Sequence, residues 1–596
     1  MLSSLVAVLP LLIIPLKRGG AVHEQNDYPI ETCASDPHFN YAQGTSKWRT
    51  KALWLSGNYF FPPTYNNTLL LMSTTFEIKL PPTDLHDPEA LRRAVLRQGP
   101  LPAADVGEII IERRSIDARS SRPVFRMRVS VLGPKETFTP EAPVMDAYGD
   151  VSEKPAVVII GCGPAGMFAA LELIELGLKP IIIERGKDVQ ARRRSLRAIQ
   201  QFGTVDPDSN YCFGEGGAGT YSDGKLYTRS LKRGNFQKTL NILAEHGAQS
   251  DILIDAHPHI GSNKLPKVVA NMRATILRCG GEIRFGHRMT ELERDDKDIQ
   301  ALIIRDAEGE TYRLEAKAYI MATGHSARDV YELLHRHNVR LEAKPFALGV
   351  RIEHPQPLID RIQYRQPERE ENLPASSYKL VTQVKGRGVF SFCMCPGGLV
   401  VPAATAPGEI VVNGMSLSRR DSPYANSGTV VAVELEDLKP YEKHGVFAGL
   451  EFQKDVEQRM FKAGNGSQAA PASRLTDFTK SKISKDLPDT SYIPGLIPAP
   501  LHQILPQSIF SRLQQGVQDF GRKMKGYYTE EANVIGAESR TSSPVRIPRD
   551  QTGYQHPDLP SLYPCGEGAG FAGGILSAAM DGQNVAQAVK ISLLNR

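Results

Sequence analysis

The segment AVVIIGCGPAG, residues 156–166, decides how this chain folds. Its apolar run predicts a buried strand, and Gly161, Gly163 and Gly166 hold the three glycine positions of a G-x-G-x-x-G turn that opens a helix. The first glycine permits the tight turn, the second lets the backbone approach a pyrophosphate, and the third lets the helix pack closely against the strand. The positive N-terminus of the helix would then face the phosphates.

A second apolar strand, PIIIE, ends at Glu184. A carboxylate in this place is expected to accept both ribose hydroxyls of an adenosine. A tight turn without a ligand would not explain an acidic residue at the end of an apolar strand. Strand, turn, helix and acidic strand end together predict a dinucleotide site.

Three glycine-rich segments further along indicate FAD as the dinucleotide: EGGAGTYSDGKL at 215–226, ATG at 322–324 and CGEGAGFAGGILSAAMDG at 565–582. Glu567 is expected to reach the ribityl chain, and Gly573 with Gly574 to open the final helix, whose positive end favours the charge that a flavin gains on reduction. The residues expected to bind the cofactor are Gly161, Gly163, Pro164, Ala165, Gly166, Glu184, Arg185, Gly216, Gly217, Gly219, Thr220, Ala322, Thr323, Gly324, Gly566, Glu567, Gly573, Gly574 and Ile575.

From about Phe76 to Asn584 the chain resembles a family of poorly characterised FAD-dependent dehydrogenases. The resemblance rests on RRSIDAR at 113–119, GCGPAG, YCFGEGGAGTYSDGKL, SFCMCPGG, VVNGMS, ESRTSSPVRI and CGEGAGFAGGI. The FAD-binding part is similar to that of the wider glutathione-reductase and hydroxybenzoate-hydroxylase class, in which Asp often stands in the place of Glu567. The resemblance implies FAD and leaves the substrate open.

The order of patterns predicts an α/β protein in several parts. Residues 72–145 are expected to form a small ferredoxin-like α/β domain, and residues 155–343 the first part of a doubly wound, Rossmann-type FAD-binding domain. Residues 344–526 are expected to be an inserted, mixed α/β substrate or cap region, and residues 527–596 the return to the FAD-binding domain. Residues 1–71 are expected to be a disordered or targeting extension.

Composition excludes several classes of function. The 596 residues are 41% hydrophobic and 23% charged, and 71 basic against 66 acidic residues give no reason to expect a nucleic-acid partner. The apolar start of the chain is interrupted by two prolines and falls short of a bilayer span, so stable membrane insertion is not expected. Seven scattered cysteines without paired CxxC motifs predict no metal site and a reducing compartment, the cytoplasm or an organellar matrix.

The sequence offers only weak candidates for catalysis, namely His325, Arg351, Glu353, Arg540, Cys393 and Cys395. The two cysteines could face the flavin as a redox pair, but dithiols of the glutathione-reductase type have wider spacings, so a buried packing role is expected. The two arginines and Glu353 fit a polar floor beside the flavin or structural ion pairs. His325 follows the ATG turn directly, and a structural role for it stays open.

No second strand–turn–helix glycine motif follows the first. A reductant such as NAD(P)H would therefore bind only transiently, or electrons would come from the substrate or from a protein electron donor. The sequence predicts an FAD-dependent oxidoreductase that transfers hydride between the flavin and a small-molecule substrate in the 344–526 region. The alternative is a binding or redox-sensing protein in which FAD is structural.

Overall fold

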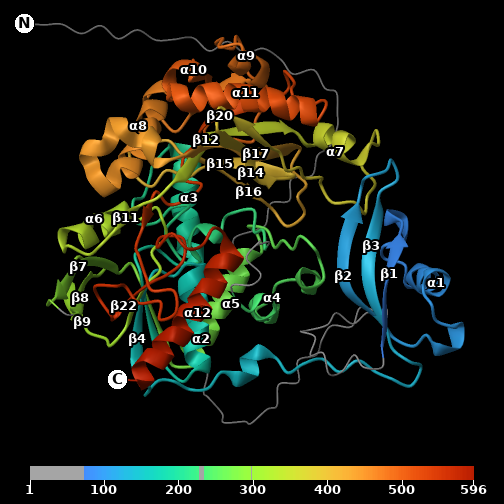
Figure 1. The fold of residues 1–596 in the computed structure, drawn as a ribbon, viewed down its shortest axis with the longest axis horizontal. Helices are drawn as coiled ribbons and strands as arrows, with labels where there is room; N and C mark the ends of the chain where they lie inside the picture. The colour runs from blue at the N-terminus through green and yellow to red at the C-terminus, as the bar shows by residue number, and fades with distance from the viewer. Residues whose placement is uncertain (1–72, 227–233, 297, 596) are drawn as a thin grey trace, which may run out of the picture. The chain divides into compact units, whose positions relative to one another are not determined.

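The structure is a computed structural model that describes residues 73–226, 234–296 and 298–595. The expected extension, residues 1–71, lies outside these ranges. The described residues form a three-stranded, a parallel five-stranded and a seven-stranded sheet, together with helices and smaller sheets (Figure 1). The mixed α/β class that the sequence predicts is confirmed.

The N-terminal part is an antiparallel sheet of order β1-β3-β2 with one helix. Its elements are β1 (Thr74–Leu80), α1 (Pro88–Gln98), β2 (Ile109–Asp117) and β3 (Val124–Val131). Ile78 and Leu80 are buried and alternate with exposed Glu77 and Lys79, as the period of a strand requires. A ferredoxin-like fold has a second helix and a fourth strand. The described chain instead leaves after β3 along a linker, so that prediction was wrong.

The second part contains a five-stranded parallel sheet of order β22-β10-β4-β5-β6. Its strands are β4 (Ala156–Ile160), β5 (Lys179–Glu184), β6 (Glu282–Phe285), β10 (Tyr319–Met321) and β22 (Leu562–Pro564). The helices are α2 (Pro164–Glu175), α3 (Val189–Phe202), α4 (Phe236–Glu245), α5 (Leu265–Arg278), α6 (Arg328–Arg336) and α12 (Ile575–Leu594).

Two cores enclose this sheet. Val157 and Ile159 of β4 pack into a core with α2, α5 and α12, whereas Val158 and Ile160 point to the opposite face. That face is covered by α6 and by an antiparallel meander, β7 (Arg288–Arg294), β8 (Ile299–Arg305) and β9 (Thr311–Leu314). Helices α2 and α12 come from opposite ends of this part of the sequence and lie side by side (Figure 1). The first residues of both helices, Pro164 and Ile575, line the cavity described below.

The third part is built on a seven-stranded sheet of order β13-β14-β17-β12-β20-β18-β19. The strands are β12 (Phe346–Pro355), β13 (Val381–Val384), β14 (Arg387–Cys395), β17 (Tyr424–Val433), β18 (Ala470–Arg474), β19 (Leu496–Pro498) and β20 (Asn533–Glu538). The helices are α7 (Gln356–Tyr364), α8 (Ala448–Ala463), α9 (Leu475–Thr479), α10 (Leu501–Ile504) and α11 (Gln507–Lys523). Two short ribbons complete it, β15 (Gly398–Pro402) with β16 (Val412–Ser416), and β11 (Glu342–Ala343) with β21 (Val545–Arg546).

The seven-stranded sheet extends past the predicted domain boundary at residue 526. Strand β20 pairs with β12 on one side and β18 on the other, both antiparallel. The sequence division assigned residues 527–596 to the FAD-binding domain as a block. In the structure the chain returns to the parallel sheet only with β22 and α12. The residues after β20 therefore pass directly from one part to the other, beside the site described next.

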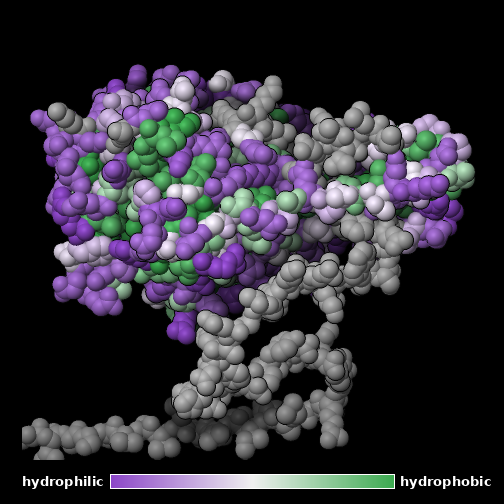
Figure 2. All heavy atoms as spheres, turned by 90° about the horizontal axis from the view of Figure 1, so that it is seen from below, coloured by the Kyte–Doolittle hydropathy of each residue, from purple (hydrophilic) through white to green (hydrophobic). Residues whose placement is uncertain are grey.

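The described helices include none that is long and apolar enough to cross a bilayer. On the face of the molecule drawn in Figure 2, hydrophilic residues cover most of the area and apolar residues form patches between them.

Candidate flavin site

A cavity of about 400 Å³ is lined by residues of both the parallel-sheet part and the seven-stranded part. Below it is called the inner cavity. The predicted cofactor residues that line it are Gly161, Gly163, Pro164, Ala165, Glu184, Arg185, Gly217, Gly219, Ala322, Thr323, Gly324, Glu567, Gly573, Gly574 and Ile575. Of the catalytic candidates, His325, Cys393 and Arg540 line it. The three glycine-rich segments and the first turn thus meet at one place.

The turn between β4 and α2 has the close packing that its glycines imply. A Cβ on Gly161, whose φ is +106°, would lie 2.5 Å from the carbonyl oxygen of Ala322, and one on Gly166 would lie 2.0 Å from that of Gly161. A Cβ on Gly163 would approach no atom more closely than 3.8 Å. Helix α2 begins after Gly163 without a side-chain cap, so the amides of its first turn are available to an anion.

Glu184 lies at the end of β5 and is only 5% exposed. Its Oε2 accepts a hydrogen bond from the amide of Cys162 at 2.8 Å, and its Oε1 accepts from the amides of Gly186 at 2.8 Å and Gly214 at 3.0 Å. A carboxylate has about four acceptor positions. Three of these bind backbone amides of the protein itself, and the contact of Glu184 with the ribose hydroxyls stays a prediction.

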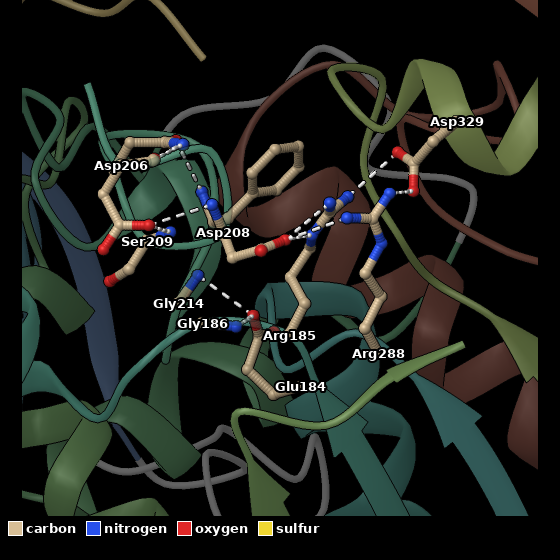
Figure 3. Close-up of polar contacts among 11 residues, drawn as sticks. Glu184, Arg185, Gly186, Asp206, Asp208, Ser209, Gly214, Arg288 and Asp329 are labelled. Atoms are coloured by element: carbon tan, nitrogen blue, oxygen red, sulfur yellow. Dashed lines mark hydrogen bonds and ion pairs between the residues drawn. The ribbon is translucent and has the colours of Figure 1, made fainter. Parts of the chain in front are cut away.

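Next to Glu184, Arg185 is part of a charge network that the sequence did not reveal (Figure 3). Its guanidinium contacts Asp208 at 2.7 Å and Asp329 at 2.9 Å, and Arg288 contacts the same two carboxylates at 3.4 and 2.8 Å. Burial alone would raise the pKa of Asp329, but the two guanidinium groups hold it below its ordinary value. Arg185 also lies 4.5 Å above the ring of Phe213.

This network lies in the inner cavity beside Glu184, where the sequence predicts the adenosine half of the cofactor. Arg185, Phe213, Arg288 and Asp329 all line it. They come from four separate segments, so neither spacing nor a motif could have grouped them. Each arginine is fixed by two carboxylates, which leaves the Phe213 ring and the guanidinium planes as flat surfaces for a nucleotide base.

Four predicted cofactor residues do not line the inner cavity: Gly166, Gly216, Thr220 and Gly566. Thr220 is buried and donates its hydroxyl hydrogen to the carbonyl oxygen of Glu215 at 3.1 Å, and a Cβ on Gly216 would collide with that hydroxyl. The amide of Gly566 donates to Asp581 at 2.8 Å. Gly166 lies in α2, where it allows close packing against Gly161, and the other three residues shape the loops beside the cavity; cofactor contact stays a prediction for all four.

His325 and Glu567 form a pair at the wall of the inner cavity. The Nδ1 atom of His325 lies 3.2 Å from Oε2 of Glu567, and its Nε2 atom lies 3.0 Å from the carbonyl oxygen of Arg540. A carbonyl oxygen only accepts, so Nε2 carries a proton. Burial would raise the pKa of Glu567, but the hydrogen bond from His325 holds it below its ordinary value. His325 thus bridges the Glu567 carboxylate and the backbone of Arg540 at the wall of the cavity.

The first turn of α12 is partly capped by the chain's own side chains. The amide of Gly574 donates to Oε1 of Glu567, and that of Gly573 donates to the hydroxyl of Ser577 at 3.0 Å. The prediction that Gly573 and Gly574 open the final helix agrees with its N-cap at Gly574. Their amides, however, are already bonded, and the next amides of the turn, at Ile575 and Leu576, are those left for a ligand.

Arg540 lines the inner cavity from a buried charge cluster that the sequence did not reveal. It pairs with Glu457 at 2.9 Å and with Glu409 at 3.1 Å, and Arg328 of α6 pairs with the same two carboxylates at 2.8 and 2.9 Å. Burial and the neighbouring Glu457 raise the pKa of Glu409 to about 7, while the arginines hold that of Glu457 low. The cluster connects α6 of one part to α8 of the other.

Arg351 and Glu353 of β12 do not line the inner cavity. Arg351 is fully buried, pairs with Glu538 and donates from Nε to Asn426 at 2.7 Å. Glu353 accepts from the hydroxyl of Thr490 at 2.6 Å, and burial raises its pKa. Neither side chain lines the cavity itself, and Arg351 contacts residues that do, Glu538 and Cys393.

The two cysteines of β14 differ in position. Cys393 lines the inner cavity, whereas Cys395 is fully buried behind it. The burial expected for both is found for Cys395 only. The two cysteines differ in position because the pairing of β14 with β17 shifts in register between Phe392 and Cys395. The local sequence gives no sign of this shift.

Comparison with known proteins agrees with this geometry. A model named FAD binding domain matches residues 154–329, one named FAD-dependent protein, C-terminal domain-like matches residues 345–541, and a domain of unknown function (DUF8436) matches residues 72–132. An uncharacterized protein of Clostridium beijerinckii is 38% identical over 519 residues, which cover 84% of this chain and 96% of that protein.

The chain belongs to a family of poorly characterised FAD-dependent proteins. Its cofactor is FAD, and its function is FAD-dependent redox chemistry. Solved structures similar to it include a geranylgeranyl bacteriochlorophyll reductase-like protein of Thermoplasma acidophilum, with 12% identity, 74% of this chain and 80% of that chain covered, and a TM-score of 0.31. A flavoprotein/dehydrogenase of Cytophaga hutchinsonii has 11% identity, 74% and 79% coverage, and a TM-score of 0.32. Likeness of this extent does not bear on the substrate.

The residues of the inner cavity fit FAD. The hydroxyls of Thr323 and Thr541 are buried, line the cavity and have no hydrogen-bond partner among the described residues. A buried hydroxyl without a partner is costly, so each calls for a polar group in the cavity. The uncapped start of α2 and the open space at Gly163 suit a pyrophosphate, and Thr323 lies directly after the strand between the two helix starts. Thr541 belongs to the segment ESRTSSPVRI, which is one of those that carry the family resemblance.

Proposed function

We propose that the protein is a dehydrogenase or reductase that transfers hydride between its flavin and a small-molecule substrate. When bound, FAD supplies the two-electron chemistry. The observation that carries the proposal is the composition of the inner cavity, in which charged and polar side chains of the seven-stranded part, Glu538, Arg540 and Asn413, face the cofactor residues of the parallel-sheet part.

This arrangement suits turnover better than storage of a structural cofactor. A structural FAD would need only contacts to its phosphates and adenosine. In this proposal α2, Glu184 and the Arg185 network supply these contacts. His325 and Arg540 line the inner cavity as well, each held in place by carboxylates, and a structural cofactor would not call for them. A guanidinium beside a flavin can stabilise the charge that develops on reduction, and an imidazole can hold or move a proton during hydride transfer.

In this proposal, the described part of the chain has no domain dedicated to binding the reductant. The described residues contain one parallel five-stranded sheet with one glycine turn, and NAD(P)H or a protein electron donor would bind transiently. The substrate would enter from the side of the seven-stranded part.

The test is an anaerobic screen of the purified yellow protein. We expect at least one nicotinamide or small-molecule hydride donor to bleach the flavin at a rate that saturates with donor concentration. A His325→Gln variant should retain FAD and slow this step. If no donor reduces the flavin faster than it reduces free FAD, the protein is instead the binding or redox-sensing protein of the alternative hypothesis.

A further inference from the structure

A second and much larger cavity, of about 2650 Å³, adjoins the inner cavity. Below it is called the outer groove. Lys225, Phe392, Cys393 and Gly573 line both, and so form the passage between them. Of these four, Cys393 carries the only nucleophilic thiol. A group at this position can react on one side with whatever occupies the inner cavity and on the other with a molecule in the outer groove.

A local distortion of β14 places Cys393 in this passage. Its φ is +48°, a conformation that residues with a side chain seldom adopt, and the pairing with β17 shifts by one residue between Phe392 and Cys395. Bulges of this kind re-aim a side chain and are common next to active sites. Cys395 follows two residues later and is buried against the same strand.

Two cations lie against the cysteine pair. Nη2 of Arg351 donates to the carbonyl oxygen of Cys393 at 2.9 Å and to the sulfur of Cys395 at 3.6 Å. The ammonium group of Lys225 donates to the carbonyl oxygen of Met394, between the two cysteines. Buried cations beside a thiol favour its thiolate, which is the reactive form.

The charges around the pair differentiate the two thiols. A hydrogen bond from the Cys395 thiol, together with the charges of Lys225 and Arg351, lowers the pKa of Cys393 to about 5 against the opposing effects of burial and Asp223. Of the opposing carboxylates, Asp223 is paired with Arg420 at 2.7 Å and Glu538 with Arg351. The pKa of Cys395 is raised because it donates to Cys393 and is buried. Cys393 is therefore the more acidic thiol of the pair, and Cys395, whose sulfur donates to the carbonyl oxygen of Cys393 at 3.4 Å, the less acidic.

We propose that Cys393 and Cys395 form a redox-active dithiol that exchanges two electrons with the flavin and with a disulfide substrate in the outer groove. The proposal rests on the proposed redox function of the flavin. When the Cys393 thiolate and the Cys395 thiol become a disulfide, they lose two electrons and the Cys395 proton, and oxidised flavin gains both as a hydride equivalent. The reverse step regenerates thiolate and thiol from the disulfide at the expense of reduced flavin.

Exchange with the substrate balances in the same way. The Cys393 thiolate attacks one sulfur of the substrate disulfide, forming a mixed disulfide and releasing a thiolate. Cys395, after losing its proton, attacks Cys393, which closes the internal disulfide and releases the second thiolate. Reduced flavin then restores the dithiol, and its own electrons come from a hydride donor of the nicotinamide class.

The lining of the outer groove indicates the charge of that substrate. Nine of its side chains are Lys or Arg and three are Asp. Phe390 and Phe392, which are 37% and 43% exposed, add apolar surface near the passage. A disulfide flanked by carboxylates is the chemistry that this lining recognises, whether it belongs to a small thiol compound or to an acidic peptide.

The first experiment measures thiolate formation in the reduced, FAD-loaded full chain. Iodoacetamide is applied from pH 4.5 to 9 and each cysteine is followed by peptide mass spectrometry. We expect Cys393 to be alkylated well below the pH at which an ordinary thiol reacts, and Cys395→Ser to shift its profile to higher pH. Cys279→Ser, which alters a buried thiol outside both cavities, should leave the profile unchanged. A Cys393 profile like that of a free thiol would overturn the proposal.

The second experiment follows the electrons without turnover. The reduced protein is freed of reductant under anaerobic conditions and titrated with 3,3′-dithiodipropionate, which is anionic, or with cystamine, which is cationic. We expect an internal Cys393–Cys395 disulfide in the wild type and a stable mixed disulfide at Cys393 in Cys395→Ser, both formed at least tenfold faster with the anionic probe. Equal reaction rates with the two probes would contradict the preference for an anionic substrate. If no internal disulfide forms in the wild type, the proposed redox role of the dithiol is wrong.

An acidic peptide disulfide serves as a third probe, and faster reaction than with dithiodipropionate assigns the groove to a peptide substrate. The two hypotheses fail separately. In one outcome, hydride donors bleach the flavin equally in the wild type and in the Cys393→Ala/Cys395→Ala variant, but the bleached flavin of the wild type does not reduce the internal disulfide. The proposed function then stands, and the dithiol exchange is wrong. If the internal disulfide forms but no hydride donor bleaches the flavin, the proposed function is the one that fails.

Discussion

Glu184 serves the fold and the cofactor at the same time, since its carboxylate binds three backbone amides and lines the inner cavity. Glu184→Ala leaves buried donors without a partner, at roughly 1–3 kcal/mol for each donor. We therefore expect lower thermal stability of the apoprotein as well as weaker FAD binding, whereas Glu184→Gln, which keeps one acceptor oxygen, should show smaller losses of both. Calorimetry and titration of the apoprotein with FAD measure the two effects. An unchanged FAD affinity in Glu184→Ala would show that another residue holds the ribose.

Glu409 gives the protein a pH-dependent stability. Burial and Glu457 raise its pKa to about 7 from an ordinary value of 4.5. A carboxyl whose pKa is higher in the folded state contributes stability that is present below 4.5 and lost as the pH rises through about 7. We expect Glu409→Gln to show a smaller loss of stability over this window in urea unfolding. The exposed Glu436→Gln is the control, and a variant that follows the wild-type pH profile would contradict the assignment.

At the scale of elements, the contact between α2 and α12 holds the two helix starts at the inner cavity. A Cβ on Gly582 of α12 would lie 2.1 Å from the carbonyl oxygen of Ala165 and 3.1 Å from the amide nitrogen of Ala169. Because these are backbone atoms of α2, Gly582→Ala must move one helix. We expect reduced FAD occupancy and a lower melting temperature, read by absorbance and calorimetry. Gly149→Ala, where no atom lies within 4 Å, should resemble the wild type, and full occupancy in Gly582→Ala would refute the coupling.

Elements defined by local pattern were predictable, and those defined by distant pairing were not. The turn at Gly161, the strand before it and the start of the last helix at Ile575 follow from glycine spacing and hydrophobic period. Strand β20 could not be assigned, because its partners β12 and β18 lie far away in sequence. The same holds within the site, where Arg185 meets Asp329 across 144 positions and Arg540 meets Glu409 across 131. The bulge at Cys393 depends on the register with β17, which no local pattern encodes.

At the scale of the whole molecule, the described residues form both cores of the FAD-binding part and a cavity lined by the predicted cofactor motifs. We therefore expect a chain that lacks residues 1–71 to fold with the same FAD content per chain and the same melting temperature as the full chain. Flavin absorbance after denaturation and calorimetry measure this. A clear fall in either value would show that the extension contributes to the fold.

The N-terminal part is held to the parallel-sheet part through Arg114, within the RRSIDAR segment. Its guanidinium pairs with Asp255 at 2.7 Å and Asp251 at 2.8 Å, and its backbone exchanges hydrogen bonds with the segment at Ile254 and Ala256. The side chain of Arg114 is 15% exposed, so removing it leaves two partly buried carboxylates without their cation. We expect Arg114→Ala to speed proteolytic cleavage in the linker of residues 133–155.

FAD should be retained in that variant, because Arg114 lies outside the inner cavity. Arg113→Ala is the matched control, since Arg113 is the neighbouring residue of the same segment and no ion pair joins it to Asp251 or Asp255 in the described structure. Limited proteolysis with mass spectrometry gives the cleavage rate at the linker. If Arg114→Ala is cleaved no faster than Arg113→Ala, the backbone bonds alone hold the two parts together. If Arg114→Ala instead loses FAD, docking of the N-terminal part reaches the flavin site and is required for its shape.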